Sequence, residues 1–417
     1  MFSFLRRRKR NPDFSRLRVF MAGNMNNYPF LMGRALIELG HEVVLCTVRD
    51  ELLHRPQSLL EAAQSLPWVR DMSHLSEEAD YIHSSTRLNE LIEIAASCDV
   101  ALLNDLTLGM AHRLDCPHVA FTTGSDISYY ACLDMPAIRM QAWDPTYRRS
   151  ADGRKLERVY QESAARQREG IASALFCTTM NRGSAPDSDA ILDQLGVLDP
   201  ARLALPISNV DHLTFDPPKM RDEPLKILMG SRLNFSDVSE PGRGMLDNKG
   251  ADVLLRGFAQ FVAAGGRAEL RLPIKGRDLE RARQCILQWG LESHVQWLPE
   301  MPLLSFYDEI RRADIVCDQF GTSIPSMLAW DTLAIGRPLV GNLRHDIFTP
   351  AYGTPIPGMH CVDAEAVADA LRLLTDYRLR LDLAENGRHF AERHYSARML
   401  AEELVIRIRE SLLQASF

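Results

Sequence analysis

The feature that most constrains the fold is an apolar strand that ends in a glycine and a cation and is followed by a helix. The strand covers residues 225–229 and runs into Gly230-Ser231-Arg232-Leu233. After a polar insert, Asn248-Lys249-Gly250-Ala251-Asp252 opens an apolar helical segment that reaches Ala264. This order predicts an α/β unit in which the strand end and the helix start lie close together. Such a place favours negative charge, because backbone N–H groups and the positive end of the helix dipole point to it.

Two cations accompany this unit. Arg232 offers a fork-shaped donor to phosphate oxygens, and Lys249 offers a point-like one. Each alone is better explained as a solvated surface side chain, because most Lys and Arg residues are exposed. A diphosphate site is therefore predicted only in combination with other features of the same half of the chain.

Three further elements follow in that half. They are Val295-Gln296-Trp297-Leu298-Pro299, the apparent strand Ala313-Asp314-Ile315-Val316, and the run Asp331-Thr332-Leu333-Ala334-Ile335-Gly336-Arg337-Pro338-Leu339-Val340. With the glycine–cation unit and Lys249-Gly250-Ala251-Asp252-Val253-Leu254-Leu255, their order resembles the C-terminal domain of the family 4 retaining glycosyltransferases of the GT-B fold. The resemblance implies an α/β fold of two Rossmann-like domains that face each other across a cleft, and a nucleoside-diphosphate sugar as donor. It also implies that no metal ion and no cofactor takes part.

The N-terminal half shows the alternation of a doubly wound sheet. An apolar strand at 17–22 ends at Gly23, a helical run covers 29–39, and a second strand covers 43–46. Later strands are predicted at 100–103, 118–121 and 174–178. Strands that are apolar along their whole length predict a parallel sheet with helices on both faces.

A connector is predicted where the chain turns proline-rich and polar, at Leu205-Pro206-Ile207-Ser208-Asn209-Val210-Asp211 followed by Phe215-Asp216-Pro217-Pro218. This phrase is similar to one that lies between the two domains of the family, so the resemblance extends over residues 15 to 410. The predicted organisation is a basic tail at 1–13, an acceptor domain at 14–210 and a nucleotide-sugar domain at 211–395. A C-terminal helix at 396–417 is expected to pack back on the N-terminal domain.

The resemblance also implies roles for single residues in the second domain. Arg232 and Lys249 are the expected catalytic residues, because fixed cations stabilise the charge that grows on a leaving diphosphate. The expected donor-binding residues are Gly230, Leu298, Ser323 and Asp331. Asp331 would accept hydrogen bonds from the two ribose hydroxyls.

One donor position departs from the family. Family members carry a glutamate where this chain has Ser323, which cannot supply a charge. A mechanism that needs a carboxylate there is in doubt, unless Asp318 at the end of the preceding strand takes its place.

The expected acceptor-binding residues lie in the first domain. The Gly23-Asn24-Met25-Asn26-Asn27 turn presents backbone N–H groups to an acceptor or to the diphosphate. Thr122-Thr123-Gly124-Ser125-Asp126-Ile127 resembles a family segment that contacts the transferred sugar, although Thr123 stands where a histidine is common. Asp126 either binds the acceptor or caps the helix that follows.

Asp187-Ser188-Asp189 has two interpretations. It resembles the Asp-x-Asp triplet of metal-dependent transferases. It precedes a helical run at 191–195, however, so the favoured interpretation is that Asp187 or Ser188 caps that helix.

Composition and charge limit the partners. The net charge is −7, and the eight cysteines lie far apart without a ligand cluster, which predicts reduced thiols, no zinc and a cytoplasmic protein. No apolar run reaches transmembrane length, and no secretory signal precedes the basic residues 6–10.

Basic residues gather again in 139–168. They indicate either a solvated helix face or contact with anionic lipid at the inner face of a membrane or with a phosphorylated acceptor. Nucleic acid is not expected, because no binding motif accompanies the charge.

The sequence therefore predicts a glycosyltransferase that moves a sugar from a nucleoside-diphosphate sugar to an unidentified acceptor, with retention. Two alternatives stay open. One is a catalytically impaired nucleotide-binding or scaffold protein, suggested by Ser323 and Thr123. The other is a nucleotide-sugar epimerase of the same fold.

Overall fold

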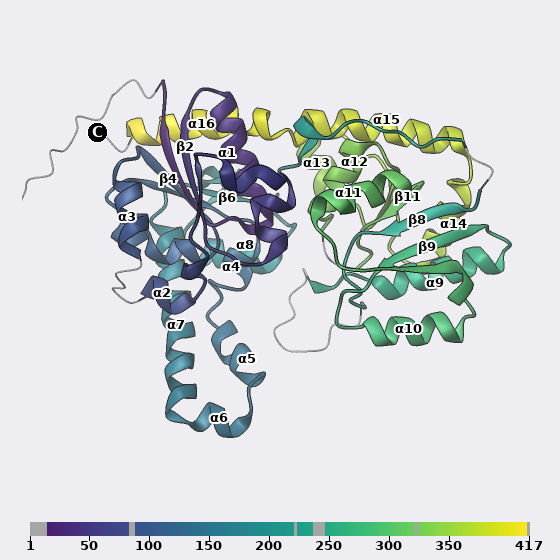
Figure 1. The fold of residues 1–417 in the computed structure, drawn as a ribbon, viewed down its shortest axis with the longest axis horizontal. Coiled ribbons are helices and arrows are strands. Elements are labelled where there is room, and N and C mark those ends of the chain that lie inside the picture. The colour runs from purple at the N-terminus through teal and green to yellow at the C-terminus, as the bar shows by residue number, and fades with distance from the viewer. Residues whose placement is uncertain (1–14, 83–87, 221–222, 237–246, 322–323, 415–417) are drawn as a thin grey trace, which may run out of the picture.

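The computed structural model describes residues 15–82, 88–220, 223–236, 247–321 and 324–414 of the chain. These residues form two α/β domains that lie side by side, and two long C-terminal helices run across both (Figure 1). The predicted basic tail at 1–13 and Ser323 lie outside the described residues.

The first domain is built on a parallel sheet of order β3-β2-β1-β4-β5-β6-β7. Its strands are β1 (Arg18–Ala22), β2 (Glu42–Thr47), β3 (Val69–Asp71), β4 (Val100–Leu103), β5 (His118–Phe121), β6 (Cys177–Thr179) and β7 (Arg202–Ala204). Its helices are α1 (Tyr28–Glu38), α2 (Glu78–Ile82), α3 (Asn89–Ala96), α4 (Ser125–Ser128), α5 (Met135–Gln141), α6 (Pro145–Arg149), α7 (Ala151–Ala172) and α8 (Pro186–Gln194). Short 3₁₀ turns fill several of the connections.

The second domain is built on a parallel sheet of order β10-β9-β8-β11-β12-β13. Its strands are β8 (Leu225–Met229), β9 (Ala268–Pro273), β10 (Val295–Leu298), β11 (Ile315–Cys317), β12 (Leu339–Gly341) and β13 (Met359–His360). Its helices are α9 (Ala251–Ala263), α10 (Leu279–Gln288), α11 (Leu303–Arg312), α12 (Met327–Ile335), α13 (His345–Tyr352) and α14 (Ala364–Leu373). The prediction of a two-domain α/β fold with parallel sheets is confirmed.

Each sheet is covered on both faces, which explains why its central strands are mostly apolar. Successive strand residues point to opposite faces. In β8, Leu228 belongs to one buried cluster, whereas Ile227 and Met229 belong to the cluster on the other face. In β1, Val19 and Phe20 are divided in the same way.

The two domains share part of one hydrophobic core. A single cluster of buried side chains contains Phe30 of α1, Leu228 of β8 and Trp330 of α12. It continues into α15 (Tyr377–His394) and α16 (Ala397–Gln414), where Phe390 and Leu400 belong to it. These two helices follow one another along the upper side of both domains, and α16 lies against α1 (Figure 1).

A helical hairpin projects from the first domain. It consists of α5, α6 and the first half of α7, and it extends away from the sheet (Figure 1). Its base is fixed by Arg139, whose Nη1 and Nη2 donate to Glu78 over 2.6 and 3.0 Å. Helix α6 at its tip has no buried residue. In the described part of the chain, no helix is both long and apolar enough to cross a membrane.

Candidate functional site

The carboxyl ends of β8 and β11 meet at one edge of the second sheet, because the two strands are parallel neighbours. Gly230 follows β8, and its backbone N–H donates to the carbonyl oxygen of Cys317 over 2.9 Å. Leu328, in the first turn of α12, covers Gly230: a Cβ there would lie 1.7 Å from Leu328 Cδ2. In doubly wound sheets, ligands bind at this edge.

Arg232 and Lys249 lie close together at this edge. The Arg232 side chain is 54% exposed, and its Nη2 lies 4.0 Å from Asp247 Oδ1. Burial and the neighbouring Arg232 lower the pKa of Lys249 to about 8, against the opposing effect of Asp318 and Asp247. A partly buried ammonium next to an exposed guanidinium is a suitable arrangement for binding an anion with several oxygens.

The start of α9 holds Lys249 in place. The Lys249 carbonyl oxygen accepts from Phe320 N over 2.9 Å. Gly250, the N-cap, has φ +64°, and a Cβ on it would lie 2.4 Å from Gly321 N. The segment before α9 is therefore in direct backbone contact with the residues after β11, so the position of Lys249 depends on both.

Asp318 lies directly beneath these cations, at the end of β11. Its side chain is buried and accepts from Ser326 N (2.8 Å) and Ser326 Oγ (2.6 Å), and its pKa is raised by burial. Its carbonyl oxygen accepts from Ser231 Oγ over 3.0 Å. Asp318 thus links the turn after β8 to the start of α12, and it lowers the net positive charge around Lys249.

A third cation at this edge was not predicted from the sequence. Arg277 follows β9 and forms ion pairs with Asp247 and Asp278, so Asp247 lies between Arg232 and Arg277. Its backbone N–H donates to Asn234 Oδ1 over 3.2 Å. The signal was present, because Lys275-Gly276-Arg277 repeats the strand–glycine–cation order seen after β8.

Leu298, one of the expected donor-binding residues, is the last residue of β10. Its side chain is 4% exposed and belongs to the shared core, and its carbonyl oxygen accepts from Ile274 N over 2.8 Å. A donor molecule at the sheet edge would meet backbone here rather than the leucine side chain.

Asp331 also differs from the expectation, because protein groups already occupy both carboxylate oxygens. Oδ1 accepts from Ser208 Oγ and from Asn209 N, each over 3.0 Å, and Oδ2 accepts from Tyr307 Oη over 2.7 Å. The side chain is 2% exposed, and burial raises its pKa. A ribose cannot reach either oxygen in this arrangement, so the structure does not place Asp331 as a donor ligand.

In the first domain, Gly23 forms the turn after β1. Its φ is +86°, and a Cβ would lie 2.3 Å from the carbonyl oxygen of Asn104, so a side chain is excluded. The fully buried Asn24 is used internally: Nδ2 donates to Asn27 Oδ1 and to the His54 carbonyl over 2.7 Å each, and Oδ1 accepts from Phe30 N. The predicted contact used backbone N–H groups of this turn, but those of Gly23 and Met25 donate to the Cys46 carbonyl and to Asn104 Oδ1.

Asp126 neither caps α4 nor faces solvent. The N-cap of α4 is Gly124. Asp126 is the second residue of the helix and is fully buried. Its carboxylate accepts from Thr123 N and Oγ1 and from Asp105 N. Burial and the nearby Asp105 raise its pKa to about 6. These contacts correct both predicted roles, and they show that Asp126 holds together the ends of β4 and β5.

The Asp-x-Asp triplet lies in the first turn of α8, whose N-cap is Ala185, so neither Asp187 nor Ser188 is the cap. Asp189 accepts from Gly183 N (2.8 Å) and from Arg202 Nη1 (2.9 Å). Among the described residues, no group of three His, Cys, Asp or Glu side chains could hold a metal ion.

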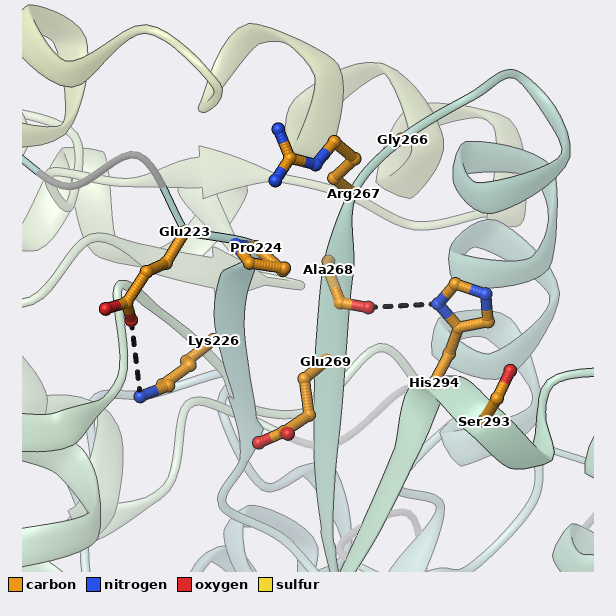
Figure 2. A pocket seen from close by; sticks show the side chains of 9 residues that line it. All are labelled: Glu223, Pro224, Lys226, Gly266, Arg267, Ala268, Glu269, Ser293 and His294. Atoms are coloured by element: carbon orange, nitrogen blue, oxygen red, sulfur yellow. Dashed lines mark hydrogen bonds and ion pairs between the residues drawn. The ribbon is translucent and has the colours of Figure 1, made fainter.

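A surface hollow lies at the opposite edge of the second sheet. It has a volume of about 450 Å³ and is lined by Glu223, Pro224, Lys226, Gly266, Arg267, Ala268, Glu269, Ser293 and His294 (Figure 2). These residues surround the amino-terminal ends of β8 and β9, whereas Gly230 and Lys249 lie beyond the carboxyl end of β8. The hollow is therefore separate from the candidate site.

Comparisons with known proteins bear on the fold. No protein-family model and no curated protein sequence matches the chain. Among solved structures, sucrose-phosphate synthase from Thermosynechococcus elongatus is 14% identical with a TM-score of 0.57, over 96% of this chain and 100% of that one. HepE from Anabaena, solved with UDP and glucose, is 13% identical with a TM-score of 0.60, over 94% and 100%. A UDP-N-acetylglucosamine 2-epimerase from Listeria monocytogenes, described as putative, is 13% identical with a TM-score of 0.52, over 96% and 97%.

The chain has the GT-B fold. The similarity to these structures extends over both domains and nearly the whole of each chain. At these identities it establishes the architecture alone.

Proposed function

We propose that this protein transfers a sugar, with retention, from a nucleoside-diphosphate sugar to an acceptor. The observation that carries the proposal is the pairing of Arg232 and Lys249 beyond the carboxyl end of β8, where the start of α9 adds a helix N-terminus. Retention rests on the resemblance to family 4 alone.

The two cations would act on the leaving group. When the bond between the sugar and the diphosphate breaks, negative charge grows on the diphosphate oxygens. Donors that are already fixed in place stabilise this charge more in the transition state than in the ground state, which accelerates the reaction. Arg232, Lys249 and the N-terminus of α9 provide such donors without a metal ion.

The solved structures support a nucleotide-sugar donor. HepE is described in complex with UDP and glucose and also with UDP-glucose. The Listeria structure, however, is described as a putative UDP-N-acetylglucosamine 2-epimerase, which is named for a different reaction on a nucleotide sugar. An epimerase therefore remains the second candidate, and a nucleotide-binding protein without turnover remains the third.

One assay separates the three. Purified protein is incubated with a panel of UDP-, GDP- and ADP-sugars, with and without an acceptor extract, and the products are separated by chromatography. Acceptor-dependent release of nucleoside diphosphate supports transfer, and an isomerised donor supports epimerisation. Binding of a nucleoside diphosphate without turnover of any donor supports the third candidate.

We also propose that the acceptor side contacts an anionic membrane surface through the α5–α7 hairpin. Trp143 at the tip is 44% exposed and packs against Tyr147, with ring centroids 5.0 Å apart. Exposed cations on the same tip are Arg149, Arg154, Lys155 and Arg158. An aromatic side chain beside cations suits the interface of an anionic bilayer, where each cation contributes about 1 kcal/mol.

The test is sedimentation with phosphatidylcholine vesicles, with and without phosphatidylglycerol. Replacing Arg149, Arg154 and Lys155 together by Gln should lower binding to anionic vesicles by about tenfold or more. The matched control replaces Arg256, Arg372 and Arg378 by Gln, three exposed cations of the second domain. Equal losses in both triple variants, or no binding by wild type, would refute the contact.

A further inference from the structure

The chain crosses between the domains twice, and the two crossings lie side by side. The first is the connector at 205–211, and the second is the junction of α15 and α16. Ser208 N donates to the Tyr395 carbonyl over 3.0 Å, and Ser208 and Ser396 form a parallel bridge. Ser396 Oγ also donates to Asp211 Oδ1 over 2.7 Å. Any rotation of one domain against the other must act on both segments. We call the two segments together the hinge ribbon (residues 205–211 and 394–398).

Asp331 ties the hinge ribbon to the second domain. Its Oδ1 accepts from Ser208 Oγ and Asn209 N, and its Oδ2 accepts from Tyr307 Oη. Tyr307 belongs to α11 and Asp331 to α12, so the carboxylate joins the connector to two helices of the second domain. The neighbouring Trp330 stacks on Tyr395 of the other crossing, with ring centroids 4.3 Å apart.

The same helix reaches the candidate donor site. One turn before Asp331, Leu328 covers Gly230, and Ser326 at the N-cap donates to Asp318 beneath Lys249. Helix α12 is short and buried along most of its length, so its two ends move as one body. It therefore connects the hinge ribbon rigidly to the groups around the cations.

We infer that Asp331 is a positioning residue that sets the orientation of the two domains by clamping the hinge ribbon to α12, and that it is not a ligand of the nucleotide. The clamp consists of three hydrogen bonds to one buried carboxylate, and bonds to charged groups are the stronger class. The inference concerns the domain connection itself and does not depend on the proposed donor.

The test compares Asp331→Asn with wild type by hydrogen exchange, calorimetry and kinetics. Asn cannot accept from Tyr307 Oη through its NH₂ group, and it lacks the charge that strengthens the other two bonds. The amide of Asn209 reports the clamp directly, because it donates to Asp331.

We expect hydrogen exchange of the 205–211 amides to rise by about tenfold or more in Asp331→Asn. The Kd for UDP, or for whichever nucleoside diphosphate the wild type binds, should change by less than about threefold. In the transfer reaction, kcat should fall while the donor KM stays nearly constant.

Asp314→Asn is the matched control. Asp314 is a buried carboxylate of the same domain that lies directly before β11 and accepts a hydrogen bond from Lys226 N. The Asp314→Asn variant should leave amide hydrogen exchange at residues 205–211 unchanged. Tyr307→Phe and Ser208→Ala each remove one donor and retain the charge, so they test the clamp if Asp331→Asn does not fold.

Two results would overturn the inference. One is unchanged connector exchange in the folded variants that break the clamp. The other is a loss of UDP affinity of tenfold or more in Asp331→Asn, which would make Asp331 a ligand. Failure of the wild type to bind any nucleoside diphosphate would refute the proposed function instead, and the exchange measurement would still test the hinge.

Discussion

Lys249 and Arg232 are two like charges that the fold holds next to each other, close enough for Arg232 to lower the pKa of Lys249. Two cations repel, so this arrangement costs stability unless an anion binds between them. Asp247 and Asp318 offset part of the repulsion in the free protein. A cluster in which carboxylates only partly offset the repulsion between two cations is more typical of a binding site than of a structural ion pair.

Replacing either cation should therefore impair the reaction strongly. We expect Arg232→Ala and Lys249→Ala each to lower kcat/KM by about 10²-fold or more, the scale of losing one fixed charge donor. Lys226→Ala is the control. Lys226 lies at the amino-terminal end of β8, away from Arg232 and Lys249, and its Nζ is 3.9 Å from Glu223 Oε2. Steady-state kinetics with the best donor of the panel checks this. Near-native rates in both variants would remove the diphosphate assignment.

The sequence predicted several of the strands that have both faces covered by other elements. The strands β4, β5 and β8 begin and end where the apolar runs do. No strand was predicted at β3, β7, β9, β10, β12 or β13. Of these, β3, β7 and β13 are two or three residues long, partly exposed and lie at sheet edges. Such strands have no apolar period to detect, and only pairing with a neighbour defines them.

The site was predictable to the same extent. Gly230, Arg232 and Lys249 come together because parallel strands end at the same edge, which is a consequence of topology. The partners of Asp331 were not predictable, since Ser208 is 123 residues away and the direction of a helical side chain depends on what packs against it. Asp126 was likewise assigned to a ligand or to a helix cap, whereas the turn at Thr123 uses its carboxylate.

Gly250 should be more sensitive to substitution than its φ alone suggests. Both Gly250 and Gly265 have positive φ, but a Cβ on Gly250 would lie 2.4 Å from Gly321 N, whereas none is within 4 Å at Gly265. Gly265→Ala should cost about 1 kcal/mol of unfolding free energy from backbone strain. Gly250→Ala should cost roughly 1–3 kcal/mol more, because the neighbouring backbone must move. Urea unfolding of the two variants measures the difference, and equal costs would contradict the close contact.

Activity should survive removal of divalent metal ions. Asp189 of the Asp-x-Asp triplet is already paired with Arg202, and Asp187 is exposed at the start of α8. We expect transfer in excess EDTA to stay within about twofold of the untreated rate, because cations of the chain supply the charge. Asp187→Ala should behave like wild type. Loss of activity that Mg²⁺ or Mn²⁺ restores in wild type and not in Asp187→Ala would instead support a metal site at the triplet.

Binding of the nucleotide should weaken as pH rises, because Lys249 carries its charge only below its pKa of about 8 in the free protein. Its lowered pKa means that the folded protein releases this proton earlier than the unfolded chain does, and a bound diphosphate restores the proton by favouring the ammonium form. Calorimetry with UDP should show the affinity falling by about tenfold or more between about pH 7.5 and about pH 9.5, the scale of one charged hydrogen bond. Lys249→Arg retains its charge over this range and should flatten the profile, even if the affinity itself is lower. If the profile of Lys249→Arg falls as steeply as that of wild type, another group titrates, and Lys249 does not contact the diphosphate.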